Sequence, residues 1–328
     1  MRWSLLIAVF GLSIADVPSF AQGRPDGQRP STTSSTPEDA GFFASKGVVR
    51  FQLIQGRLCL DAPRHRKGSQ NREDGQVYES ITVTAQRGIP SLHYVYQAPQ
   101  QHLTLSVQQA TAMRLESFAP ETGERSILEQ PAVGEITWTH RRGDLESTFQ
   151  GATLLHLRCS DPVSFDHHFG AIFARLLRGQ SIGNLCRGVD AELLRGTVGV
   201  DAPELQQIER YVWQLRSSKR SKRLEAEQTL LEWGTPIVSV IQSLSPEDLD
   251  PEQRERIRHI LKRLRPRDND TSASLARLLI NDQQYWSLIA DHLSPSQLVR
   301  ANNHLHRVGL KTLQPSAGPV ERIAAARD

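Results

Sequence analysis

The spacing of apolar residues changes near residue 160, and this change limits the folds that the chain can adopt. Before it, apolar and polar residues alternate, as in VVRFQLI (48–54), LTLSV (103–107) and ITWTH (136–140). Such alternation is typical of β-strands that bury one face. After it, apolar residues recur every three or four positions, as in helices. The sequence therefore predicts an α+β protein, with an N-terminal antiparallel β-rich domain (sheet or sandwich) followed by an all-α domain.

Turn residues divide the first part into short strands. QG at 55–56, ETG at 121–123 and RGD at 142–144 interrupt the alternating runs, and glycine in such positions favours tight turns. Eight to ten strands are expected, the last of them ending at Cys159 in HLRCSDP. The stretch 61–76 is polar and dense in charge, which favours a mobile loop.

The helical part begins at Asp161-Pro162, a pair that suits a helix N-cap and first turn. Six apolar residues follow at helical spacing: Phe165, Phe169, Ile172, Phe173, Leu176 and Leu177. A second, shorter helix is expected over 190–194. From about residue 202 to 311 the patterns are all helical, and SPSQ at 294–297 offers a capping box.

Glycine and proline in LLEWGTPIVSVIQSL (230–244) stop one helix and start the next. Gly234 stands where a helix C-terminus calls for positive φ. Pro236 stands at a first helical position, where its missing N–H costs nothing. A helix ending at Trp233 and a helix running from Ile237 would then form an antiparallel hairpin.

This segment resembles one unit of a HEAT-like (armadillo-type) helical repeat, over residues 205–265. A basic and a small residue early in the first helix, then leucine, glycine, proline and aliphatic residues occupy the places of that pattern: Arg223, Ala226, Leu230, Gly234, Pro236, Ile237 and Ile241. The resemblance implies a surface that binds other proteins and brings no catalytic residues. One clear unit is present, whereas a free solenoid needs three or more.

The N-terminus has the order of a signal peptide. Arg2 precedes an apolar run at 4–15, and small residues in SFA (19–21) predict cleavage after Ala21. The mature chain is then expected to be extracytoplasmic (periplasmic or secreted), without a transmembrane span. An uncleaved membrane anchor is the alternative.

The predicted organisation combines these features with a linker whose residues 22–40 contain almost nothing apolar, which favours disorder. It is a signal peptide at 1–21, a disordered linker at 22–44, a β-rich domain at 45–160, a helical connector at 161–200, a HEAT-like α-helical domain at 201–312 and a disordered tail at 313–328.

Three cysteines, Cys59, Cys159 and Cys186, allow at most one internal disulfide. An oxidising compartment permits such a bond, and Cys59 with Cys159 is the favoured pair, because both lie at the ends of predicted strands. The alternative is three free cysteines buried as small apolar side chains.

Motifs for catalysis and metal binding lack the context that their chemistry needs. GQSIG (179–183) fits the G-x-S-x-G nucleophile elbow, but Ser181 would have to follow a strand, and the run before it is helical. In DHH (166–168) adjacent histidines would point about 100° apart on an α-helix, and the histidines of HLH (304–306) do not share a helix face. No catalytic residue, metal ligand or cofactor is therefore predicted.

A basic segment marks the expected contact surface. RSSKRSKR (216–223) has five positive charges and no negative one, and four of them are the predicted partner-binding residues: Lys219, Arg220, Lys222 and Arg223. Cations at a helix N-terminus oppose the macrodipole, so a binding patch for an acidic protein or an anionic envelope polymer would explain them. The alternative is a solvated helix start.

The expected function follows from these signals. Aromatic residues do not interleave with the basic segment, which argues against nucleic acid, and the formal net charge of +3 is too small to name a partner. We expect an exported, non-enzymatic protein-binding scaffold. The alternatives are an extracytoplasmic hydrolase that uses Ser181 and an envelope structural protein.

Overall fold

The computed structural model describes residues 42–43, 49–61, 68–86, 89–195 and 203–314. All of them belong to one compact unit. The predicted signal peptide lies outside the described residues, as does most of the predicted linker and tail. Within the predicted linker, Phe43 is buried against the rings of Phe51 and Tyr94, so the β-rich core begins before residue 45.

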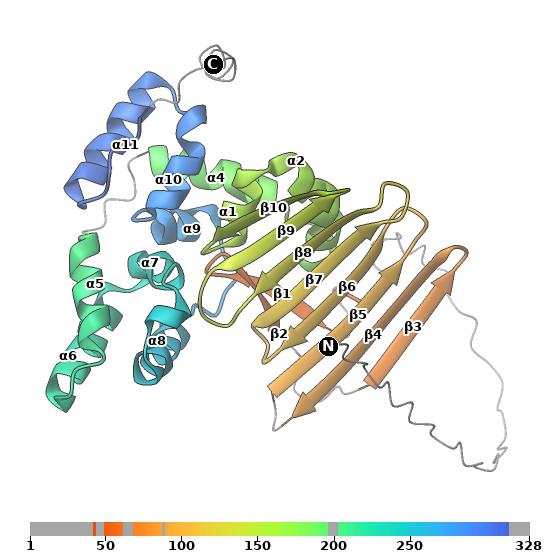
Figure 1. The fold of residues 1–328 in the computed structure, drawn as a ribbon, viewed down its shortest axis with the longest axis horizontal. Coiled ribbons are helices and arrows are strands. Elements are labelled where there is room, and N and C mark those ends of the chain that lie inside the picture. Colours follow the sequence, from red (N-terminus) through yellow and green to blue (C-terminus); the bar gives the residue numbers. More distant parts are fainter. Residues whose placement is uncertain (1–41, 44–48, 62–67, 87–88, 196–202, 315–328) are drawn as a thin grey trace, which may run out of the picture. The chain divides into compact units, whose positions relative to one another are not determined.

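Ten strands form two antiparallel sheets in the described part of the chain (Figure 1). The smaller sheet pairs β1 (Arg50–Ile54) with β2 (Arg57–Asp61). The larger one has eight strands, each paired with the next along the chain: β3 (Gly68–Asp74), β4 (Val77–Gln86), β5 (Ile89–Gln97), β6 (His102–Gln108), β7 (Ala112–Ala119), β8 (Glu124–Gln130), β9 (Ile136–Arg142) and β10 (Leu145–Gly151). The prediction of an antiparallel β-rich region is confirmed.

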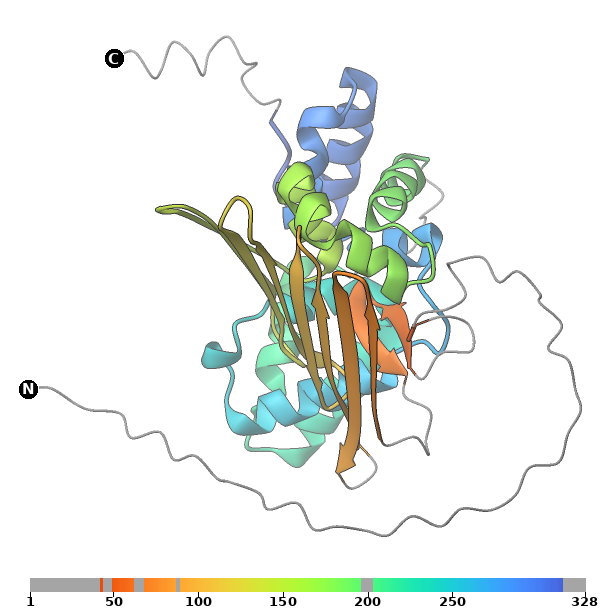
Figure 2. The same ribbon diagram turned by 90° about the vertical axis from the view of Figure 1, so that its right-hand side faces the viewer.

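The alternating pattern gives the larger sheet one buried face. Leu103, Leu105 and Val107 of β6 are buried, while the residues between them are partly exposed. The register places Leu105 opposite Leu115 of β7, which is also buried. Apolar residues on neighbouring strands thus stack into one layer, as a period of two requires. Figure 2 shows the twist of this sheet.

Two local predictions for the β-rich half are wrong. Residues 68–74, predicted as part of a loop, form the edge strand β3, and all seven are exposed. An edge strand needs only backbone pairing on one side, so charged side chains suit it. Residues 154–160, predicted to carry the last strand, form helix α1 instead. Thr153 caps this helix by accepting from the backbone N–H of Leu155, 3.2 Å away.

Helical elements make up the rest of the described chain, which confirms the α+β order. They are α1 (Leu154–Ser160), α2 (Pro162–Phe165), the π-helical η2 (Asp166–Gly170), α3 (Ala171–Leu176), α4 (Ile182–Leu194), α5 (Leu205–Gln214), α6 (Arg220–Trp233), the 3₁₀ turn η3 (Thr235–Ile237), α7 (Val238–Gln242), η4 (Pro246–Asp248), α8 (Pro251–Arg263), α9 (Ser272–Leu279), α10 (Gln283–Ile289), η5 (Ala290–His292) and α11 (Pro295–Arg307). Every described helix is too short or too polar to cross a bilayer.

Helix boundaries follow the local chemistry. Asp161 accepts from the backbone N–H of Ser164 at 3.1 Å and so caps α2, with a proline at its first turn. Ser294 and Gln297 form the predicted capping box of α11. The helix expected over 190–194 is longer than predicted, because Ser181 caps α4 from its start.

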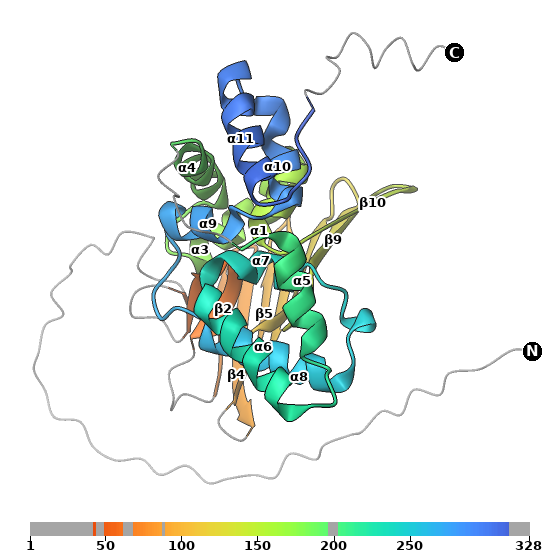
Figure 3. The ribbon, with the colours of Figure 1, turned by 90° about the vertical axis from the view of Figure 1, so that its left-hand side faces the viewer.

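The Gly-x-Pro segment acts as a stop and a start, as predicted. Gly234 ends α6 with φ of +71°, and Pro236 lies in the first turn of η3, which leads into α7. Helix α6 contacts η3, but it also contacts α5 and α8. Figure 3 shows α5, α6 and α8 as neighbours. The HEAT-like character of this region stays a prediction.

The turn between β1 and β2 joins the small sheet to the helices. The backbone N–H of Gly56 donates to Asp270 Oδ2 at 2.7 Å, and its carbonyl accepts from the N–H of Leu154 at 2.9 Å. Gln55 Nε2 donates to the carbonyl of Leu264 at 3.0 Å. Buried apolar residues of both halves form one continuous cluster, so strands and helices share a core.

Candidate functional site

A cavity of about 450 Å³ lies between hairpin turns of the β-rich half and helix α8. Four cationic residues line it, and we call this cavity the cationic pocket: Arg57, Arg258, Lys262 and Arg265. None of the described residues that line it is Asp or Glu. Its volume is in the range of ligand sites in proteins, and its charge has one sign.

Arg57 is the buried cation of the pocket, with 5% of its surface exposed. Its guanidinium donates to the backbone carbonyls of Pro131 at 2.6 Å, Gly134 at 2.9 Å and Ala152 at 3.0 Å, and to Gln242 Oε1 at 3.4 Å. These acceptors are neutral. Burial lowers the pKa of Arg57 to about 10, so the group is still charged at pH 7. A buried charge without a counter-charge is costly, and an anion in the pocket would relieve that cost.

The α8 side of the pocket supplies three further cations. Arg258 is paired with Glu255, whereas Lys262 and Arg265 form no salt bridge with any described residue. Arg265 contacts the thiol of Cys59. Burial raises the pKa of Cys59, and the nearby Arg265 offsets this only in part, so the thiol is neutral at pH 7. The unpaired charges of Lys262 and Arg265 are available to a ligand.

The opposite wall is held by tight turns. Gln55 and Gln109, in the β1–β2 and β6–β7 turns, have backbone φ angles of 55° and 52°. Residues other than glycine seldom adopt such positive values. The side chain of Gln130 bonds to both the N–H and the C=O of Leu58, at 3.0 and 2.9 Å, and to the carbonyl of Thr111 at 2.7 Å. The wall is therefore fixed before any ligand arrives, which limits the entropy lost on binding.

The structure separates the four predicted partner-binding residues into two groups. Lys219, Arg220 and Lys222 are exposed at the start of α6. Arg223 is partly buried, and its Nη1 donates to the carbonyls of Ser217 at 2.7 Å and Ser218 at 3.2 Å. Arg223 thus ties the α5–α6 turn to the helix, which leaves three of the four predicted partner-binding residues exposed.

Ser181 does not have the setting of a nucleophile elbow. It follows the turn after α3 and caps α4, where its Oγ accepts from the backbone N–H of Asn184 at 3.4 Å. An elbow needs a strand before the serine and a histidine in reach. The preceding element is helical, and no histidine forms a hydrogen bond with Ser181 among the described residues.

All three cysteines are free thiols in the structure. The premise for pairing Cys59 with Cys159 is wrong, because Cys159 lies in α1 and not at the end of a strand. Its thiol instead lies close to that of Cys186 in α4, and the interaction between the two thiols lowers the pKa of Cys159 and, together with burial, raises that of Cys186.

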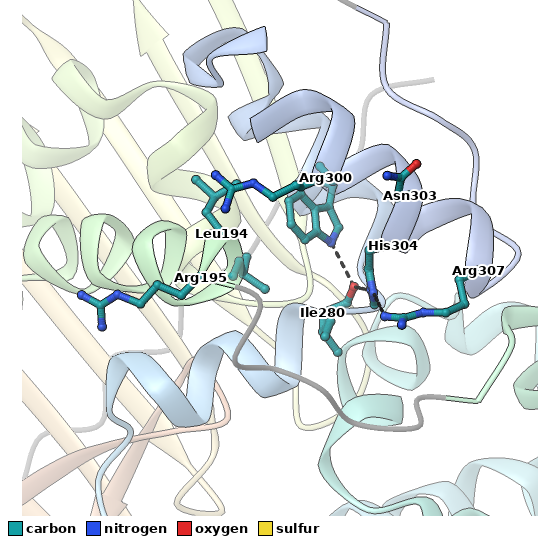
Figure 4. Close-up of a pocket in the computed structure, with 10 residues that line it drawn as sticks. Leu194, Arg195, Ile280, Arg300, Asn303, His304 and Arg307 are labelled. Carbon is teal, nitrogen blue, oxygen red and sulfur yellow. Dashed lines mark hydrogen bonds between the residues drawn. The ribbon is translucent and has the colours of Figure 1, made fainter. Parts of the chain in front are cut away.

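A second cavity, of about 350 Å³, lies between α4 and α11 (Figure 4). Its polar groups are mostly satisfied: Arg195 pairs with Glu192, and His304 bonds to the carbonyl of Ile280 at 3.0 Å. Arg195 and Arg307 extend to different sides of the cavity in Figure 4. We therefore prefer the cationic pocket as the ligand site.

The histidines of the two sequence motifs lie in different environments. His306 is exposed on α11, while His304 is committed to a backbone carbonyl. In η2, however, the rings of His167 and His168 lie 4.9 Å apart and face Glu124 of β8. Burial, with the charges of His140 and His167, lowers the pKa of His168 to about 4. Its ring is neutral at pH 7.

The cationic pocket was missed because its residues are up to about 200 positions apart in sequence. No local signal marked it: RLCLD (57–61) has a charged residue at each end, and only the structure shows that Arg57 is buried while Asp61 is exposed. No protein-family model, curated protein or solved structure matches this chain.

Proposed function

We propose that the protein is a non-catalytic binding protein that takes an acidic segment of a partner protein into the cationic pocket. The observation that carries this proposal is the unpaired positive charge: Arg57 is buried among neutral acceptors, and Lys262 and Arg265 have no carboxylate partner among the described residues. Charge-assisted hydrogen bonds to such groups are stronger than neutral ones.

The other residues of the lining favour a peptide over a small inorganic anion. Side-chain amides of Gln109 and Gln242 stand beside the apolar side chains of Ile89, Val133 and Leu261. Amides match the donors and acceptors of a peptide backbone, and the apolar patches match its neighbouring side chains. A phosphate ion would leave these apolar surfaces without a contact.

The wider setting of the proposal is the one that the sequence suggests. An exported scaffold with a HEAT-like helical region would present helices α5, α6 and α8 as a rigid surface beside the pocket. The exposed cations at the start of α6 are the alternative contact surface, which the experiment below separates from the pocket. Export and the repeat character are part of the proposal and rest on the sequence patterns alone.

The test compares two double variants that remove equal charge. A fluorescein-labelled peptide of alternating Glu and Leu residues is titrated with the full chain, and its anisotropy is followed. Lys262→Gln with Arg265→Gln should weaken binding about tenfold, which corresponds to about 1.4 kcal/mol. Lys219→Gln with Lys222→Gln should change affinity less than about twofold, since exposed charges outside the site are screened.

The outcomes separate the possible sites. A larger loss in the Lys219 and Lys222 variant would place the contact on the basic segment and overturn the pocket. Equal binding of a Gln-Leu peptide would show that charge is not recognised, and would also overturn the proposal. Both variants should keep the wild-type melting temperature, because the substituted side chains are not in the core.

A further inference from the structure

A second cluster, apart from the cationic pocket, brings three metal-ligating side chains together. Glu124 begins strand β8, and His167 and His168 lie in the π-helical turn η2. One ligand atom from each lies within 4.8 Å of the others. A π-helical turn is rare and occurs often at functional sites. Adjacent histidines point about 100° apart on an α-helix, whereas these two lie in a π-helical turn and the third group comes from the sheet.

The unpartnered nitrogen of His168 points to a ligand. Its side chain is 1% exposed, and its Nε2 has no hydrogen-bond partner. A buried nitrogen without a partner loses the bonds that water would give it. Glu124 Oε2 is the nearest carboxylate oxygen, at 3.6 Å from Nε2, which is too long for a hydrogen bond.

The same separation suits two ligands of one ion. Zinc binds nitrogen and oxygen at about 2.0–2.2 Å in tetrahedral geometry, so two such ligand atoms lie about 3.3 Å apart. A cation between Nε2 of His168 and Oε2 of Glu124 would satisfy both atoms after a small adjustment. His167, which is exposed, is free to turn its ring toward the same point.

Neighbouring side chains hold these groups as metal ligands are held. His168 Nδ1 lies 3.3 Å from Ser117 Oγ, and Gln101 Nε2 donates to that oxygen and to the carbonyl of His168, both at 2.9 Å. Such a bond at one ring nitrogen fixes the tautomer that presents the other to a metal. Arg142 Nε bonds to the second oxygen of Glu124 at 3.0 Å, which leaves Oε2 for the ion.

We propose that Glu124, His167 and His168 bind a divalent cation of the zinc type, with three protein ligands and one open position. Two histidines and one carboxylate are a ligand set that zinc accepts, and the open position takes water. The site lies at the end of the sheet and does not depend on the proposed peptide ligand.

The test is a calorimetric titration of ZnCl₂ into the full chain after dialysis against EDTA. The wild type should bind one equivalent, and its melting temperature should rise with zinc. His167→Ala and Glu124→Gln should each weaken zinc binding by at least about tenfold, as loss of a metal-site partner does. His306→Ala removes an exposed histidine elsewhere and should bind like the wild type.

His167 is exposed, so its variant should keep the fold, which circular dichroism will check. A concentration of about 0.1 mM zinc is far above the dissociation constants of structural zinc sites. Absence of saturable binding by the wild type up to that concentration would overturn the proposal. Unchanged affinity in both the His167 and Glu124 variants would place the zinc elsewhere and overturn it equally.

Discussion

Replacing Gly56 with alanine should lower the free energy of unfolding by about 2–5 kcal/mol. Gly56 has φ of +70°, and a left-handed conformation costs an L-residue roughly 1–2 kcal/mol. An added Cβ would lie 2.5 Å from Cβ of Thr153. The turn cannot move away, because hydrogen bonds to Asp270 and Leu154 fix it on both sides. Forced repacking of this kind costs about 1–3 kcal/mol more.

Gly75 provides the matched control. It has φ of +60°, and a Cβ added there would meet no atom within 4 Å. Gly75→Ala should therefore cost only the conformational term of about 1–2 kcal/mol. Urea unfolding, followed by tryptophan fluorescence and by circular dichroism, measures both variants against the wild type. Equal losses would refute the reasoning, since they would show that the contact with Thr153 relaxes without cost.

Three further changes probe other parts of the molecule. Asp282→Asn should lower the free energy of unfolding by about 1.5–3 kcal/mol at pH 7, because it weakens the buried bond to His156. Burial alone would raise the pKa of Asp282, but the charge and hydrogen bond of His156 lower it. The stabilisation is therefore complete above the ordinary pKa near 3.9, and the difference between variant and wild type should shrink at pH 3 in urea unfolding. Mild oxidation should link Cys159 to Cys186, and peptide mapping that finds either one joined elsewhere would contradict their pairing. Ser181→Ala should lower the free energy of unfolding by about 1 kcal/mol through the lost cap of α4 and leave any esterase activity unchanged. Loss of such an activity would instead support Ser181 as a nucleophile.

Features encoded by neighbouring residues could be predicted from the sequence. The stop at Gly234, the start at Pro236 and the capping box at Ser294 each depend on a few adjacent residues, and the structure shows all three. The edge strand β3 was missed because its pairing comes from the backbone of β4, while its side chains look like those of a loop. Helix α1 was missed because a run of seven residues carries too little periodicity to distinguish helix from strand.

Neither candidate site could be predicted in the same way. The cationic pocket combines Arg57 of β2 with Arg265 after α8, and the metal cluster combines Glu124 of β8 with the η2 turn. Such pairings depend on how distant elements pack, which no local pattern records. The basic segment was found because it is contiguous, yet the structure commits Arg223 to backbone carbonyls.

The hydrogen bond between Gly56 and Asp270 also limits how early the chain can complete its fold during synthesis. The two residues are 214 positions apart, and at 5–20 residues per second a ribosome needs roughly 10–40 s to add that length. Throughout this interval the backbone N–H of Gly56 lacks its native acceptor, although α1 and α3, which contact the turn and β1, are already made. Contacts of such long range slow folding and leave partly folded chains open to aggregation. Chains truncated before residue 270 should therefore remain prone to aggregation. Their rescue by a separately supplied C-terminal half would measure how late in synthesis the native fold is completed.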